Sequence, residues 1–130
     1  MKKLVIVLLF LFMAIPAVAA HQYLEKGYQA AWCSARGGIQ EYRLDDGARV
    51  DCLLPEYAVE FDFGYKWAEC VGQAIYYGQK TTRTPACVLI IEDAKKDVVF
   101  VERLRITATK AGVKWWTIDK NELETERKKP

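Results

Sequence analysis

Residues 47–77 constrain the fold most, because they read as two short strands followed by one helix. Pro55 separates two segments, 48–53 and 57–63, whose apolar and aromatic content is typical of strands. Gly64 then precedes residues 65–79, where apolar side chains recur at helical spacing. Such a unit buries its apolar faces only within a larger sheet that helices cover.

The flanking segments supply the rest of that sheet. Helical spacing is found in 21–35 and 95–111, and strand character in 39–44, 87–91 and 113–118. The continuous apolar run 87–91 is typical of a strand that is buried on both faces. The order predicts an α/β fold, with an αβββαβ core whose mixed central sheet is flanked by helices, followed by an additional helix and strand.

The N-terminus has the pattern of a secretory signal peptide. Lys2 and Lys3 precede an apolar run, and small residues at Val18 and Ala20 suit a cleavage after residue 20. We therefore predict a signal peptide over 1–20, a folded domain over 21–118 and a charged C-terminal tail over 119–130. A retained membrane anchor is the alternative, because the run 4–20 reaches only the lower limit of a bilayer span. Cleavage predicts a periplasmic or secreted protein without stable membrane association.

Removal of residues 1–20 makes the chain formally neutral. Without Lys2 and Lys3, the 19 basic residues fall to 17, which equals the 17 acidic residues. Tight non-specific binding to DNA usually depends on a clear excess of positive charge. The neutral balance therefore counts mildly against tight non-specific DNA binding, and a local basic patch is left open.

All four cysteines lie beyond residue 20, which in an exported small domain indicates disulfides. Four cysteines allow three pairings, and of these we predict Cys33–Cys52 and Cys70–Cys87. Cys52 follows Asp51 in a strand, so its side chain must lie on the opposite face. A zinc site is the competing use, but no CxxC or CxxH spacing occurs.

Three acidic residues in the two central strands predict a metal site. Glu60 and Asp62 are two apart in one strand and project from the same face. If the neighbouring strand pairs with this one, Asp51 and Glu60 can converge on one point. Carboxylates with open coordination positions suit Mg²⁺ or Mn²⁺, which keep waters and accept a substrate phosphate.

A polar stripe follows on the predicted helix. At 100° per residue, Lys66, Gln73 and Tyr77 fall within about 40° of one another, and Glu69 lies near them. An ordinary amphipathic helix with a solvated edge would have the same spacing. The acidic strands next to it favour a functional role.

These residues resemble the motifs of the PD-(D/E)XK nuclease superfamily. An Asp in the second strand, an acidic residue in an apolar third strand and the order αβββαβ carry the resemblance, and QAIYY, residues 73–77, looks like the Q-x-x-x-Y motif of the RecB-type branch. The resemblance implies a metal-dependent nuclease that acts on nucleic acid, DNA rather than RNA. It implies that Asp51 and Glu60 bind Mg²⁺ or Mn²⁺, and that Gln73 and Tyr77 line the site.

Position 62 departs from this pattern, because the family places a lysine there and this chain has Asp62. Lys66 could reach back to the position of the missing lysine, where it would orient the attacking water or stabilise charge on the phosphate. Alternatively, Asp62 could be a third metal ligand. Glu25 is the candidate for the glutamate that the first helix often contributes in this family, against the alternative of an ordinary surface residue.

Two other functions remain open. One is a catalytically inactive binding module that retains the nuclease fold, and the other is a small disulfide-stabilised periplasmic protein with a structural role. Outside the cluster, Asp45 and Asp46 precede Gly47 and are interpreted as turn formers. Trp115 and Trp116 are expected to divide between core and surface and not to form a base-stacking platform.

Overall fold

The computed structural model describes residues 20–129, so nearly all of the predicted signal peptide lies outside the described residues. No helix within 20–129 is long and apolar enough to cross a membrane. One five-stranded sheet, in the order β1-β2-β3-β4-β5, organises the chain. Its strands are β1 Ile39–Arg43, β2 Arg49–Leu53, β3 Tyr57–Phe63, β4 Thr84–Ile91 and β5 Lys114–Asp119. The helices are α1 Glu25–Ser34, α2 Trp67–Thr81, α3 Ala94–Ala111 and α4 Lys120–Arg127, with a 3-10 turn at Gly64–Lys66.

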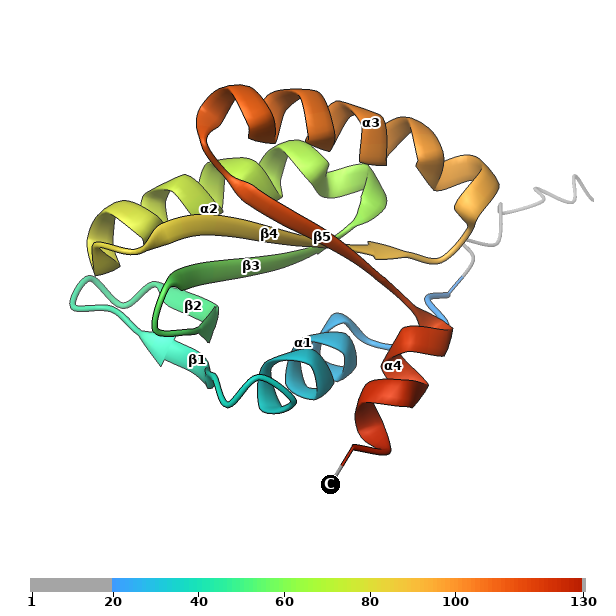
Figure 1. Ribbon diagram of the computed structural model, residues 1–130, viewed down its shortest axis with the longest axis horizontal. Coiled ribbons are helices and arrows are strands. Elements are labelled where there is room, and N and C mark those ends of the chain that lie inside the picture. The colour runs from blue at the N-terminus through green and yellow to red at the C-terminus, as the bar shows by residue number, and fades with distance from the viewer. Residues whose placement is uncertain (1–19, 130) are drawn as a thin grey trace, which may run out of the picture.

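The sheet is mixed, as the order of the segments predicts. Strands β1, β2 and β3 form an antiparallel meander, whereas β3, β4 and β5 run parallel. Parallel neighbours require crossover connections, and α2 and α3 provide them. Figure 1 shows α2 and α3 together on one side of the sheet and α1 with α4 on the other. The general α/β architecture with helices on both faces is therefore confirmed.

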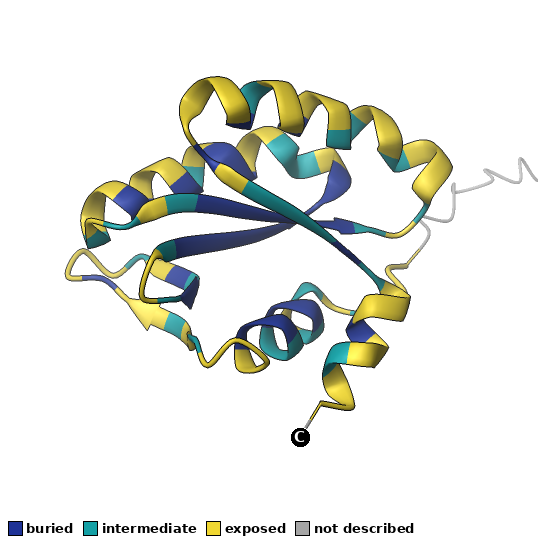
Figure 2. Ribbon diagram, in the orientation of Figure 1, coloured by how far each residue is buried: buried dark blue, intermediate teal, exposed yellow. Residues whose placement is uncertain are grey.

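Of three apolar clusters among the described residues, the two larger ones fill the layers. One joins α1 and α4 to the sheet through Tyr28, Trp32, Phe61 and Leu123. The other joins α2 and α3 to the sheet and includes Leu89 and Leu104. Figure 2 shows the central strands β3 and β4 largely buried, while the outer surface of α3 is mostly exposed. Burial on both faces accounts for the continuous apolar run in β4.

Trp115 and Trp116 divide between the two faces of the sheet. Trp115 packs partly buried against the cluster under α2 and α3, and Trp116 packs partly buried against the cluster under α1 and α4. Alternation along a strand explains the division. The expected split between core and surface is thus a split between two layers.

The turn between β1 and β2 contains Asp45 and Asp46, as predicted. The Asp46 carboxylate accepts a hydrogen bond from the Ala48 amide at 3.0 Å, and Gly47 supplies the positive φ of 89° that the turn requires. The turn is also tied to the end of α2, because Lys80 Nζ lies 2.7 Å from Asp45 Oδ1 and Tyr76 donates to Asp46.

The residues predicted as a charged tail form α4. Asp119 caps this helix, and Asp119 and Glu122 exchange hydrogen bonds in a capping box. Leu123 is fully buried against the α1 side of the sheet. A single apolar side chain with a good cap therefore extends the domain beyond residue 118.

One of the two predicted disulfides is present. Cys33 and Cys52 are bonded, with a sequence separation of 19, and they link α1 to β2. Cys70 and Cys87 are free buried thiols, so the predicted second bond is wrong. The Cys70 thiol lies 3.5 Å from the Glu60 carbonyl oxygen, to which it donates, and burial raises the pKa of this thiol. Because the thiolate is the form that reacts, Cys70 is held in its inert form.

We predict that the denatured, unreduced protein presents two reactive thiols and the reduced protein four. Loss of the Cys33–Cys52 bond in a Cys33→Ala/Cys52→Ala variant is expected to lower the free energy of unfolding by about 3 kcal/mol, because a loop of this length is no longer closed in the unfolded chain. Thiol titration and urea unfolding measure both quantities. A Cys70→Ala variant is the matched control and should keep the disulfide. Four reactive thiols without reductant would contradict the assignment.

Candidate functional site

The site begins where β2 and β3 separate. The two strands pair only at Cys52 with Val59 and at Leu53 with Ala58. One residue further, the Asp51 carboxylate accepts a hydrogen bond from the Phe61 amide at 2.8 Å. A side chain therefore replaces a backbone acceptor in the ladder, and Asp51 is fixed beside β3.

Gln29 in α1 holds the other side of Asp51. Its side-chain amide donates to the Asp51 carbonyl oxygen at 2.7 Å and to the Glu41 carboxylate at 2.9 Å. Gln29 is buried, and Glu41 has a positive φ of 52°, a conformation that non-glycine residues adopt mainly under local constraint. The sequence reasoning missed Gln29. The sequence does contain a signal for its burial, because Gln29 lies three residues before Trp32 and so falls on the buried stripe of the helix.

Glu60 and Asp62 lie on the opposite face of β3 from Val59 and Phe61, as the alternation predicts. Their partners across the sheet are Cys87 and Leu89, which belong to the cluster under α2 and α3. Only 6% of Glu60 and 3% of Asp62 is exposed. One carboxylate oxygen of each, Glu60 Oε2 and Asp62 Oδ2, is buried without a hydrogen-bond partner.

The Asp51 and Glu60 carboxyl groups are close enough to shift each other's pKa. Burial raises the pKa of Asp51 to about 6, although the Phe61 amide opposes the shift. Burial, followed by the charges of Asp51 and Asp62, raises the pKa of Glu60 further. Glu60 thus retains its proton more strongly than Asp51 does. Two carboxylates packed this closely favour sharing a proton or a cation.

Lys66 lies beside Asp62 at the start of α2. Its amine is 3.5 Å from Asp62 Oδ1 and 3.8 Å from Glu69 Oε2. Burial raises the pKa of Asp62 to about 7, against the opposing effect of the Lys66 charge. The Asp62 charge in turn raises the pKa of Lys66, which keeps the amine protonated.

A hollow of about 390 Å³ opens at this edge of the sheet, between α1, α2 and the separated strands. The predicted residues that line it are Glu25, Asp51, Glu60, Gln73 and Tyr77. Lys26 and Arg49 are exposed and add positive charge to its lining. The Tyr77 hydroxyl donates to the side-chain amide oxygen of Gln73 at 3.1 Å, and burial raises the pKa of Tyr77 to about 12.

The structure therefore gathers most of the predicted site. Asp51, Glu60, Gln73 and Tyr77 share one hollow, and Glu25 joins them from α1. Burial raises the pKa of Glu25 too, unlike that of an ordinary surface carboxylate. Asp62 and Lys66 are paired next to the hollow but do not line it.

The carboxylates present suit a hard divalent cation. Within residues 20–129, no group of three or more His, Cys, Asp or Glu side chains is placed so that it could hold a metal ion. Mg²⁺ commonly binds through one or two carboxylates and keeps its other positions for water and substrate. The close Asp51–Glu60 pair and the orphaned Glu60 Oε2 fit that mode, because a buried acceptor without a donor is relieved by a cation.

Comparison of the chain with models of protein families, with curated protein sequences and with solved structures finds no match.

We predict that Glu60→Gln stabilises the fold at high pH in metal-free buffer and has little effect at low pH. Raised pKa values mean that the folded chain binds protons more tightly than the unfolded chain. The stabilising contribution is complete below about pH 4 and is lost as the pH rises through about 6 at Asp51 and about 7 at Asp62. Burial, followed by the charges of Asp51 and Asp62, raises the pKa of Glu60 to about 11, so at pH 8 this side chain must take up a proton when the chain folds. Glu60→Gln removes that cost, so at pH 8 its melting temperature should exceed that of the wild type by at least about 4 °C.

The difference between the two proteins should vanish near pH 4, where the wild-type cluster is protonated. Thermal unfolding with EDTA present measures it. Glu69→Gln is the matched control, because Glu69 is exposed on the adjoining helix. A wild type more stable than Glu60→Gln at pH 8 would show that the buried charges do not oppose one another.

Proposed function

We propose that this protein is a divalent-metal-dependent phosphodiesterase that hydrolyses nucleic acid, DNA in preference to RNA. The observation that carries the proposal is the convergence of Asp51 and Glu60 from two strands at a solvent-accessible hollow, with a buried carboxylate oxygen of Glu60 left without a partner. Desolvating like charges destabilises a fold, so a ligand of opposite charge is the simplest reason for such a pair.

Asp51 and Glu60 would hold Mg²⁺ or Mn²⁺. Such an ion, when bound, supplies Lewis acidity toward a phosphodiester and positive charge for the transition state. In the hydrolysis, a water oxygen forms a bond to phosphorus and the bond to the leaving sugar oxygen breaks. The role of the chain is then to position the phosphate and stabilise its developing charge.

Other residues in and beside the hollow suit that role. Lys66 stays an ammonium because Asp62 raises its pKa, so it would stabilise phosphate charge and not act as a base. Gln73 and Tyr77 supply neutral hydrogen-bonding groups from α2. Lys26 and Arg49 are the cations of the lining and would contact the flanking phosphates, Arg49 by exchanging its partner Glu41, which lies 2.9 Å away.

The arrangement of elements supports placing the chain in the PD-(D/E)XK superfamily with a restriction-endonuclease-like fold. An antiparallel meander followed by a parallel crossover strand corresponds to the αβββαβ core that the sequence resemblance implies. In this proposal Asp62 stands at the position of the motif lysine, and the Lys66 amine, 3.5 Å away, compensates for it.

We also propose that the protein is exported to the periplasm or secreted, with cleavage after Ala20. The Cys33–Cys52 disulfide supports this location, because such bonds persist in oxidising compartments and are rare in the cytosol.

A catalytically inactive nuclease-fold module is the second candidate function. One observation favours it: the Lys66 amine is engaged by Asp62 and Glu69 and does not line the hollow. Such a module would bind nucleic acid and leave it intact.

We expect the purified protein to cleave DNA when Mg²⁺ or Mn²⁺ is present and not in EDTA. Asp51→Asn and Glu60→Gln keep the size of the side chains but remove charge, and each should lower the cleavage rate by at least about 100-fold. Gel assays with linear and circular DNA, and with RNA, measure the rate. Glu102→Gln on the exposed face of α3 is the matched control. Calorimetry without metal binding, together with intact DNA and RNA, would refute the enzyme.

The contribution of Lys66 can be separated from that of Asp62. If the Lys66 amine stabilises phosphate charge, Lys66→Met should reduce the cleavage rate about 100-fold, and Lys66→Arg should recover part of it. Lys80→Met, at the other end of α2, should leave the rate unchanged. Full activity in Lys66→Met would instead favour Asp62 as a third metal ligand.

A further inference from the structure

A second pocket lies at the far end of β3 from Asp62. Its volume is about 320 Å³, which is the size of a small-ligand site and too small for a folded partner. The elements that form it are the C-terminal end of α1, the loop between β2 and β3, the first residue of β3 and the middle of β5. Its lining includes Trp32, Arg36, Leu54, Glu56, Tyr57 and Trp116.

Three aromatic rings make the walls of this pocket. The Trp116 ring centroid lies 5.4 Å from that of Trp32, with an interplanar angle of 56°. It lies 5.4 Å from that of Tyr57, with an interplanar angle of 88°. Tyr57 and Trp116 are only partly buried. Rings set at such angles present a face and an edge to one guest, which is the geometry that suits a flat aromatic ring.

The charges around the rings disfavour a cationic guest. The Arg36 guanidinium lies 3.9 Å from the Trp32 ring centroid, and Lys114 Nζ lies 5.6 Å from that of Trp116. These cations already use the negative ring faces that an alkylammonium ligand would need. Arg36 is also held in place, because Nη1 donates to the Trp32 carbonyl oxygen at 3.0 Å and lies 3.5 Å from Glu126 Oε1, a partner that an anionic guest would have to share. The flat guest is therefore neutral or carries an anionic group.

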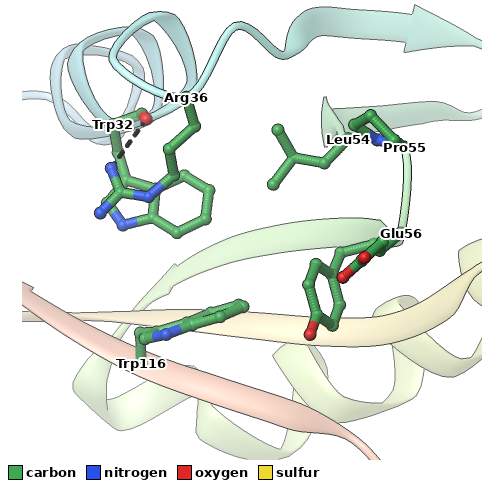
Figure 3. A pocket seen from close by; sticks show the side chains of 7 residues that line it. Trp32, Arg36, Leu54, Pro55, Glu56 and Trp116 are labelled. Atoms are coloured by element: carbon green, nitrogen blue, oxygen red, sulfur yellow. Dashed lines mark hydrogen bonds between the residues drawn. The ribbon is translucent and has the colours of Figure 1, made fainter.

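A carboxylate stands across the pocket from the guanidinium. Figure 3 shows Arg36 and Glu56 on opposite sides of the pocket, with Trp116 along its base and Leu54 closing the side toward the strand loop. Glu56 is exposed, and a carboxylate can accept hydrogen bonds from the exocyclic amino group of a base. The two sides thus differ in charge, as the two ends of a nucleotide do.

We propose that this pocket binds one nucleobase of a nucleotide or of a single strand. The base lies against Trp116 and Tyr57, its amino group faces Glu56, and its phosphate faces Arg36 and Lys114. The choice of a nucleobase among flat ligands rests on the proposed nuclease function. The pocket predicts a preference for bases with an exocyclic amino group, such as adenine, over thymine.

The experiment is a titration of the purified protein, in EDTA, with dAMP, dTMP, a short oligo(dA) and deoxyribose 5-phosphate. Binding is followed by tryptophan fluorescence and calorimetry. We expect saturable binding of dAMP or oligo(dA), weaker binding of dTMP, and none of deoxyribose 5-phosphate. Tighter binding of dAMP than of oligo(dA) would identify a free nucleotide as the ligand, and the reverse order would identify a strand.

Variants assign the binding to this pocket. Trp116→Leu should weaken binding at least about tenfold, as expected for loss of one base-stacking ring. Trp115→Leu, its neighbour on the opposite face of β5, is the matched control. Arg36→Gln and Glu56→Gln change only exposed side chains and so test the pocket without disturbing the core. The first should weaken binding and reduce its salt dependence, and the second should reduce the preference for dAMP over dTMP.

Failure of the protein to bind both dAMP and oligo(dA) would overturn the inference. Equal binding by Trp116→Leu, Arg36→Gln and the wild type would overturn it too. Because EDTA removes divalent metal, this result is separate from the cleavage assay. Cleavage without base binding would refute the pocket alone. Binding without cleavage would refute only the nuclease, and the same titration with Asp51→Asn should then be unchanged.

Discussion

The hydrogen bond from the Phe61 amide to the Asp51 carboxylate is the interaction on which the site depends. It lies where β2 and β3 cease to pair, so it satisfies a buried amide that would otherwise lose its ladder partner. It also turns Asp51 toward Glu60. This one hydrogen bond therefore marks the end of the β2–β3 pairing, lies where the hollow opens and positions the Asp51 carboxylate. Gln29 holds Asp51 in this place by donating to its carbonyl oxygen.

The acidic cluster of Asp51, Glu60 and Asp62 lowers the stability of the fold, and the rest of the domain has to offset this loss. Burial raises the pKa values of Asp51, Glu60 and Asp62, which means that their charged forms are disfavoured in the folded state. Only Asp62 has a cation next to it, at 3.5 Å. Two apolar cores and the Cys33–Cys52 bond hold the surrounding elements in place. Strain concentrated at one site within a well-packed domain is typical of functional residues.

Much of the fold and of the acidic cluster was predictable from local periodicity. Strand alternation places Glu60 and Asp62 on one face and Cys52 opposite Asp51, and both relations hold in the structure. What the chain order could not show is how far β2 and β3 pair, and hence that Gln29 would reach the Asp51 backbone. The helix over 120–127 was not predicted, because Leu123 is its one buried side chain and its apolar period is therefore too weak to detect. The pairing of Cys70 with Cys87 failed because a shared face does not decide whether two thiols are oxidised.

The acidic hollow and the aromatic pocket follow from one property of the sheet. Strand β3 has Glu60 and Asp62 on the face toward α2, and Tyr57, Val59 and Phe61 on the face toward α1. Where covering helices stop short, the first face exposes carboxylates and the second exposes aromatic rings. Acidic groups suit a cation and a phosphate, whereas rings suit a base. A nucleotide contains both a phosphate and a base. Because acidic and aromatic side chains alternate along β3, the strand can present the acidic face to the phosphate and its cation, and the aromatic face to the base.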